Sequence, residues 1–294
     1  MGFAATFIEV KYPESKDCWC DPGKGTNRDT WCFALGGFSP LDPAYETAEE
    51  TLGQNAAYAI ELFARQHRSF IFSVFICGEH VRFIRWDRAG LIVSQACNYV
   101  LYPRYLCEFF WRFAHLSDAQ RGFDLSVRPA TKDEEKYFEQ AVTQHNITQV
   151  DPANREAFDL VALLQTHHMA NGVSVIHLPS QGGDRARDLL VSRPLTIPLS
   201  LTGRTTRAYW AVEYSADSPD PSPMVVLKDT WRLHEGFGND TEGNILREME
   251  AAEVPNIPSV VCDRDVYRNA LDTWPAGRPL CMSRSSPVSC WIGN

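Results

Sequence analysis

A lysine and a glutamate in the second half of the chain are the residues best suited to chemistry on a charged ligand. Lys228 ends the apolar run V-V-L-K, and Glu242 begins the helical pattern that follows it. A strand and the helix after it can bring an amine and a carboxylate into one space. The helix face of Glu242 also carries three apolar residues that we expect to be buried: Ile245, Leu246 and Met249.

The elements that would position this pair lie between Leu201 and Met249. The segment opens with L-T-G-R-T-T-R-A-Y-W-A-V-E-Y, a turn at Gly203 followed by an apolar, aromatic run typical of a strand. A Ser/Pro/Asp loop leads to M-V-V-L-K-D-T-W-R, a further strand, and D-T-E-G-N-I-L-R-E-M-E then has the period of a helix. Strands joined by a glycine turn, a strand that ends in lysine and a helix that presents glutamate follow the order of a protein kinase small lobe.

Several stretches carry a more specific likeness. G-R-T-T-R-A-Y-W-A-V, V-V-L-K-D-T-W and the upstream Q-H-R-S-F-I-F-S-V-F-I-C-G-E-H-V-R-F-I-R-W-D-R-A-G-L-I-V-S, followed by R-G-F-D-L-S-V, resemble the fungal-type protein kinase family over roughly residues 1–262. The resemblance implies a kinase domain behind a divergent amino-terminal region. It implies ATP and Mg²⁺ as cofactors and phosphoryl transfer to Ser/Thr of a protein in the parent family.

The resemblance also implies roles for individual residues. In the kinase pattern the strand lysine holds the α- and β-phosphates of ATP, and the helix glutamate holds the lysine in place. The positions that the pattern assigns to the nucleotide are Gly203, Tyr209, Ala211, Lys228 and Glu242, with Tyr209 and Ala211 in the roof of the adenine pocket.

The chain departs from the kinase pattern in two ways. The loop over the phosphates normally has several glycines, and here Gly203 alone remains. No H-R-D-x-x-x-x-N loop and no D-F-G follow Lys228, so the catalytic base and the Mg²⁺ ligands of a kinase are missing. We therefore predict a truncated, pseudokinase-like chain that transfers no phosphoryl group alone, with neither a catalytic residue nor a metal ligand assigned in it.

The first 127 residues predict a separate α+β module. Residues 13–45 are rich in Pro, Gly, Asp and Cys and are typical of a long loop. The apolar spacing predicts the following elements: a strand over 3–11, a helix over Thr47–Gln66, strands over Phe70–Cys77 and His80–Trp86 joined by a turn at Gly78-Glu79, a strand over Leu91–Ser94, and a buried helix over Tyr102–His115.

The rest of the chain divides into three parts by composition. Residues 128–172 are charged and helical and predict a connector. Residues 173–262 predict the partial small lobe, an antiparallel sheet with one helix, and residues 263–294 predict an irregular tail because they lack periodicity. The expected fold class is therefore α+β: an amino-terminal module followed by an incomplete kinase-like small lobe.

A second constellation lies in the amino-terminal module. Nucleases of the PD-(D/E)xK class place an acid and a lysine two apart on one strand, where both side chains share a face, and use acids to bind Mg²⁺. Glu9 and Lys11 have that spacing, and Gln54 with Tyr58 resembles an accessory motif of some of these nucleases. No acid precedes Glu9, so a polar strand face is the alternative and no cleavage is expected.

Arginines gather after the predicted hairpin turn. Arg82, Arg85, Asp87 and Arg88 offer a possible ligand patch, although the solvated face of a hairpin with local ion pairs accounts for them more simply.

Two groups of metal-ligating residue types are not predicted to be metal sites. Cys18, Cys20 and Cys32 form a C-x-C with one distant cysteine and no nearby histidine, a poor zinc signature. His167 and His168 are adjacent at the end of a predicted helix and should therefore point in different directions.

Composition narrows the remaining function classes. A net charge of −9 argues against binding nucleic acid by phosphate neutralisation, and no apolar run approaches a membrane span. Nine cysteines without a secretory signal fit reduced thiols, so we expect an intracellular protein, cytoplasmic or nuclear. Two functions are compatible with the sequence. One is a kinase by descent, whose partner would be a protein substrate, and the other is a non-catalytic binding or regulatory module.

Overall fold

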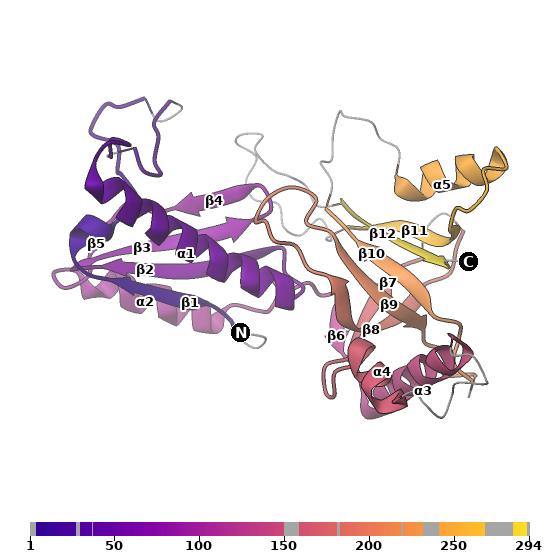
Figure 1. The fold of residues 1–294 in the computed structure, drawn as a ribbon. Coiled ribbons are helices and arrows are strands. Elements are labelled where there is room, and N and C mark those ends of the chain that lie inside the picture. The colour runs from indigo at the N-terminus through magenta and orange to yellow at the C-terminus, as the bar shows by residue number, and fades with distance from the viewer. Residues whose placement is uncertain are drawn as a thin grey trace. The chain divides into compact units, whose positions relative to one another are not determined.

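The structure is a computed structural model that describes residues 4–27, 30–36, 38–149, 159–180, 183–218, 220–231, 241–267 and 285–292. The chain forms two compact units (Figure 1), residues 1–124 with 199–202 and residues 125–198 with 203–294. Each unit pairs a β-sheet with helices, so the fold is α+β, as the sequence predicts, and the second unit is consistent with a partial kinase-like fold.

The described part of the first unit has a five-stranded sheet of order β1-β2-β3-β4, with β5 paired to β3. Its strands are β1 (Phe7–Lys11), β2 (Phe70–Cys77), β3 (His80–Asp87), β4 (Gly90–Val93) and β5 (Cys97–Asn98). β1 is parallel to β2, and the other pairs are antiparallel. The parallel pair requires a crossover, which contains the short helix η1 (Glu14–Lys16) and α1 (Pro43–Arg65). The predicted β2–β3 hairpin is confirmed, with Gly78 at a φ of 56° in its turn.

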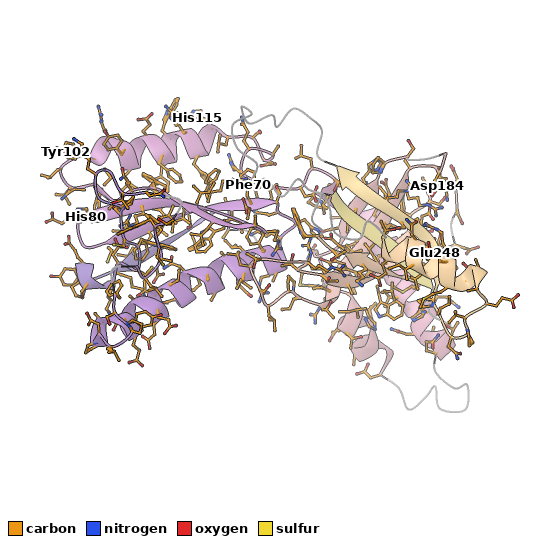
Figure 2. The ribbon with its side chains drawn as sticks, turned by 90° about the horizontal axis from the view of Figure 1, so that it is seen from above. Phe70, His80, Tyr102, His115, Asp184 and Glu248 are labelled. Carbon is orange, nitrogen blue, oxygen red and sulfur yellow. The ribbon has the colours of Figure 1, made fainter. Side chains whose placement is uncertain are left out.

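Helices cover both faces of this sheet (Figure 2). α1 packs on the face where Leu62, Phe63, Ile71, Phe75 and Trp86 form a cluster with little or no solvent exposure. The alternation of β2 turns its even-numbered residues to the opposite face, where α2 lies.

The aromatic helix α2 (Pro103–His115) is not buried, contrary to the sequence prediction. Phe109 stacks on Phe83, and Phe113 meets Phe72 edge to face, but Phe113 is the one buried residue of the helix and Trp111 is 64% exposed. The prediction is wrong because aromatic content alone does not imply burial on all sides, and the packed rings line only one side of an amphipathic helix.

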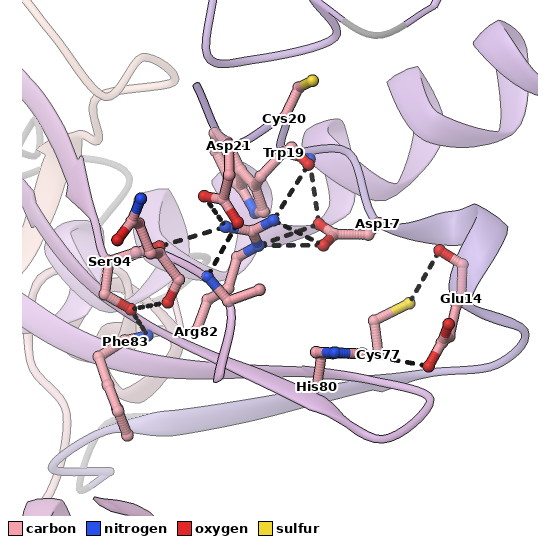
Figure 3. A network of polar contacts seen from close by, with 12 residues as sticks. Glu14, Asp17, Trp19, Cys20, Asp21, Cys77, His80, Arg82, Phe83 and Ser94 are labelled. Carbon is pink, nitrogen blue, oxygen red and sulfur yellow. Dashed lines mark hydrogen bonds and ion pairs between the residues drawn. The ribbon is translucent and has the colours of Figure 1, made fainter. Parts of the chain in front are cut away.

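The arginines after the hairpin turn do not form a solvated face. Arg82 is buried and pairs with Asp17 and Asp21, which fastens the loop after β1 to β3 (Figure 3). Arg88 is also buried, with its guanidinium over the Phe63 ring. The interpretation as local ion pairs on a solvated surface is therefore wrong for these two arginines, whose long side chains are used to close the core.

The described part of the second unit has a seven-stranded sheet of order β11-β12-β10-β9-β8-β7-β6, in which every pair is antiparallel. Its strands are β6 (Val127–Pro129), β7 (Ser174–Leu178), β8 (Arg187–Thr196), β9 (Arg207–Glu213), β10 (Val225–Asp229), β11 (Ser259–Tyr267) and β12 (Ser285–Ile292). Its helices are α3 (Lys132–Gln149), α4 (Leu160–His167) and α5 (Glu242–Ala251).

The sheet of this unit has two different apolar faces. The inner face carries Leu178, Tyr209, Ala211 and Leu227, all buried. The sheet curves around this face, because Arg264 of β11 reaches the segment that follows β7: it donates to the carbonyl of Pro179 and pairs with Asp184. In a flat sheet these strands would be about 24 Å apart.

The outer face carries the residues that alternate along each strand with those of the inner face, and helices cover it. Phe138 and Val142 of α3 pack with Leu190 and Val212 of the sheet. The segment expected to be a connector, residues 128–172, thus contains helices that pack against β8.

The segment 263–294, expected to be irregular, contains the end of β11 and the whole of β12. β12 lies between β10 and β11, and such non-local pairing has no signature in the local sequence. Its Pro287 interrupts the strand pattern, but pairing with β10 ends at Val288, so the proline lies just beyond that ladder.

Candidate functional site

The side chains of Lys228 and Glu242 form an ion pair between Nζ and Oε2. Lys228 is on β10, with its Cα opposite Ala208 of β9, and Glu242 is the first residue of α5. Their side chains are 25% and 37% exposed, so both groups remain reachable from solvent. The geometry provides a cation held in place by a carboxylate at the end of a strand.

Contacts between the start of α5 and β11 position the glutamate. Thr241 is the N-cap and accepts a hydrogen bond from the Asn244 amide, 3.2 Å away, while its hydroxyl donates to Asp263 of β11. A Cβ on Gly243 would lie 2.3 Å from Asp263 Oδ2, so the close approach of helix and strand requires glycine. Sequence reasoning missed these supporting residues, although Thr-x-x-Asn before a helical pattern is an N-cap signal.

The apolar face of α5 does not lie where the sequence predicts. Ile245 and Met249 are 44% and 39% exposed, and the buried residue of the helix is Gly243. The prediction of a buried Ile245 and Met249 is wrong because it assumed that the apolar stripe must face the sheet. The helix instead meets β11 through its smallest residue, which allows the closest backbone approach.

Tyr209 and Ala211 lie on the opposite face of the sheet from Lys228. Tyr209 is opposite Leu227 in the register, and both belong to the buried inner cluster. Since side chains alternate along a strand, Ala208 shares the face of Lys228 and its neighbour Tyr209 does not. Burial raises the pKa of the Tyr209 hydroxyl. The structure therefore does not bring Tyr209 and Ala211 together with the Lys228–Glu242 pair.

Gly203 lies in the turn before β9 with a φ of 90°, a left-handed conformation that favours glycine. A Cβ at this position would have no atom within 4 Å, so the turn approaches no other part of the described chain there. The residue suits a tight turn, and its position beside the phosphates stays a prediction.

The inner face also has a small pocket of about 120 Å³, lined among others by Arg187, Leu189, Glu213 and Cys262. Arg187 pairs with Glu213 there at 2.9 Å. Leu189 and Cys262 belong to the inner cluster, so this pocket opens on the side of the sheet away from Lys228.

The side chains around Lys228 suit the phosphates of ATP and the Mg²⁺ that accompanies them to different degrees. An amine such as Lys228 suits a phosphate oxygen. For Mg²⁺, carboxylates would be needed nearby, and within the described residues the one group of three close ligand types is elsewhere, on α3 and after α4. Asp263, the acid beside Glu242, already accepts from Thr241. The amine fits the phosphates of a nucleotide, whereas the two nearby carboxylates, Glu242 and Asp263, are already engaged by Lys228 and Thr241.

The predicted nuclease-like group is also assembled, in the first unit. Lys11 Nζ lies 2.8 Å from Glu9 Oε1 and donates to Gln54 Oε1 at 2.5 Å, and the Gln54 amide donates to the Tyr58 hydroxyl at 2.7 Å. Strand β1 and helix α1 thus share a chain of polar contacts. It contains a single carboxylate, and Glu9 belongs to no group of three metal-ligating side chains among the described residues, so the group does not fit a catalytic Mg²⁺ site built from several acids.

The three amino-terminal cysteines form no shared metal-ligand group among the described residues. Cys18 is buried, Cys20 is half-buried and Cys32 is exposed. Burial raises the pKa of the Cys18 thiol to about 12, which opposes the thiolate that zinc requires.

Comparison with known proteins gives one match. The model of a family described as fungal protein kinase matches residues 40–280, which is more than half of the chain and includes β10 and α5. Curated proteins and solved structures gave no match. None of the helices in the described ranges combines the length and the apolar character that crossing a bilayer demands.

Proposed function

Because the chain belongs to the fungal protein kinase family, we propose that it supplies the elements that hold ATP for phosphoryl transfer to Ser or Thr of a protein. Lys228 binds the α- and β-phosphates, and Glu242 fixes the direction of its amine. The ion pair between these residues is the observation that supports this assignment. The seven cysteines whose side chains the structure describes are free thiols, which fits a reducing compartment where ATP is present.

The proposal assigns binding, and not transfer, to this polypeptide alone. Its sequence contains neither an H-R-D-x-x-x-x-N loop nor a D-F-G. In a kinase these segments hold Mg²⁺ and accept the proton of the substrate hydroxyl. Without them the triphosphate charge is not neutralised, and ATP binds through Lys228 with modest affinity.

Titration with ATP tests the proposal. We expect saturable binding to the wild-type chain by calorimetry, with and without Mg²⁺. Lys228→Met should weaken it by about 10- to 100-fold, the effect of losing a charge-assisted hydrogen bond, and Glu242→Gln should weaken it less.

Lys11→Met provides the matched control, because Lys11 is also a strand lysine paired with a glutamate. This variant should bind ATP like the wild type. Absence of binding at millimolar ATP, or equal binding by the Lys228→Met variant, would overturn the assignment.

A further inference from the structure

A cluster of metal-ligating side chains lies in the second unit, away from the Lys228–Glu242 pair. Glu135 and Glu139 are one turn apart on α3, so their carboxylates share a helix face, and His168 caps the carboxyl end of α4. His168 Nε2 is 3.2 Å from Glu135 Oε1 and 3.4 Å from Glu139 Oε1. One ligand atom from each of the three residues lies within 4.8 Å of the other two.

From this geometry we propose that Glu135, Glu139 and His168 bind a divalent transition-metal ion of the zinc class. Tetrahedral Zn²⁺ with bonds of 2.0–2.1 Å places its ligand atoms about 3.3–3.4 Å apart. The two nitrogen–oxygen distances match that spacing. A histidine with two carboxylates is a ligand set that suits zinc and its neighbours better than Mg²⁺ or Ca²⁺.

The partners of these two glutamates distinguish them from other paired acids of this unit. Glu134 pairs with Arg128, Glu213 with Arg187, and Asp229 with Arg207. Among the described residues, Glu135 and Glu139 form no ion pair with an arginine or a lysine, and the ion-pair partner of both is the His168 imidazole. A divalent ion bound between these two carboxylates would offset the repulsion between their charges.

Hydrogen bonds and packing within the unit position the three side chains. The amide of Asn171 donates to Glu135 Oε1 at 2.6 Å and orients that carboxylate. The Met169 amide donates to the Ser192 hydroxyl, which fastens the turn after His168 to β8. The His168 ring is 7% exposed and lies beside Phe138, so its direction is set by packing.

The neighbouring His167 lies against Trp210, so the two adjacent histidines point in different directions, as the sequence predicts. Glu139 is the exposed member of the cluster, at 43%. Three protein ligands with one solvent-facing side leave a position for water, as in sites where the metal binds or activates a small ligand.

Metal titration of the purified full-length chain tests the proposal. After treatment with a chelator, the wild type should bind one equivalent of Zn²⁺ by calorimetry. Co²⁺ should give the visible absorption of a tetrahedral site, without a sulfur-to-cobalt charge-transfer band from the cysteines. His168→Gln and Glu139→Gln keep the size and hydrogen bonding of the side chains, and each should weaken binding at least about tenfold.

A matched control is His177→Gln, because His177 pairs with a single acid, Asp188, at 2.7 Å and has no third ligand among the described residues. It should bind metal like the wild type. If His168→Gln fails to fold, Glu139→Gln carries the test, since its side chain is partly exposed. No saturable Zn²⁺ binding by the wild type, or equal binding by a folded Glu139→Gln variant, would show that the cluster is only an ion pair between α3 and α4.

Discussion

Two neighbouring residues of β10 form ion pairs on opposite faces of the same sheet, and the pairs differ in almost every other respect. On the inner face Asp229 pairs with Arg207, and their side chains are 10% and 3% exposed. On the outer face Lys228 pairs with Glu242, at 25% and 37%. One pair is therefore withdrawn from water, and the other remains open to a ligand.

The two pairs are also held differently. Arg207 and Asp229 are directly opposite in the β9–β10 register, so the sheet itself fixes their geometry. Glu242 comes from α5, and its position depends on the contact of Gly243 with Asp263. The inner pair therefore contributes to the stability of the fold, whereas the outer pair depends on the placement of one helix and is suited to binding.

Breaking the inner pair should have the largest effect. Arg207→Met removes the cation that compensates the buried Asp229 carboxylate, and we expect a loss of about 3–5 kcal/mol in the free energy of unfolding, measured with urea. Replacing both partners, as Arg207→Met with Asp229→Leu, should recover most of this loss. A loss below about 1 kcal/mol for the single variant, the size typical of an exposed pair, would remove the distinction between the two faces.

A third pair lies between these extremes and predicts a pH dependence. The guanidinium of Arg128, together with the Thr131 amide, lowers the pKa of the Glu134 carboxyl to about 2. A lowered pKa stabilises the folded state above the ordinary value near 4.5, and this contribution disappears as the pH falls toward 2. We expect it to be about 2 kcal/mol, less than the pKa change alone implies, because Arg128 is half-exposed.

Urea unfolding at several pH values measures this contribution. Glu134→Gln should be less stable at neutral pH and should lose less stability than the wild type between pH 4.5 and 2. Identical pH profiles would show that the pair does not act through this carboxylate.

The position of α5 offers a test of the outer face. Gly243→Ala places a Cβ against Asp263 and should push the helix away from β11, at a cost of about 1–2 kcal/mol. ATP binding should weaken as well, because Glu242 moves with the helix. Gly53→Ala is the control: this glycine of α1 is exposed, and a Cβ there would have no other atom within 4 Å, so alanine should stabilise by about 0.5–1 kcal/mol.

Features that depend on neighbouring parts of the chain could be predicted from the sequence, whereas features that depend on strand pairing could not. The β2–β3 hairpin and the helix α1 follow from local periodicity, and the approach of Lys228 to Glu242 follows from a strand and helix adjacent in the chain. Local patterns do not reveal strand register. That Tyr209 faces away from Lys228 therefore follows only from its place opposite Leu227 in the sheet.

Long-range contacts account for the other differences. β12 pairs between β10 and β11, although β10 is far from it in the sequence, and α5 approaches β11 through a glycine instead of its apolar stripe. Similarly, His168 and Glu135 are distant in the sequence, and only the packing of α4 on α3 brings them together. The periodicity of a sequence predicts whether a segment is a helix or a strand. It contains little information about which other helix or strand that segment packs against.

Breaking the outer pair should have the smallest effect on stability. Lys228→Met should change the free energy of unfolding by less than about 1 kcal/mol, because a partly exposed ion pair contributes little and methionine keeps the aliphatic contacts of the side chain. The same urea measurement that detects the Arg207→Met loss tests it. If Lys228→Met were as destabilising as Arg207→Met, the outer pair would be part of the structural framework, and a role in holding phosphate would lose its support.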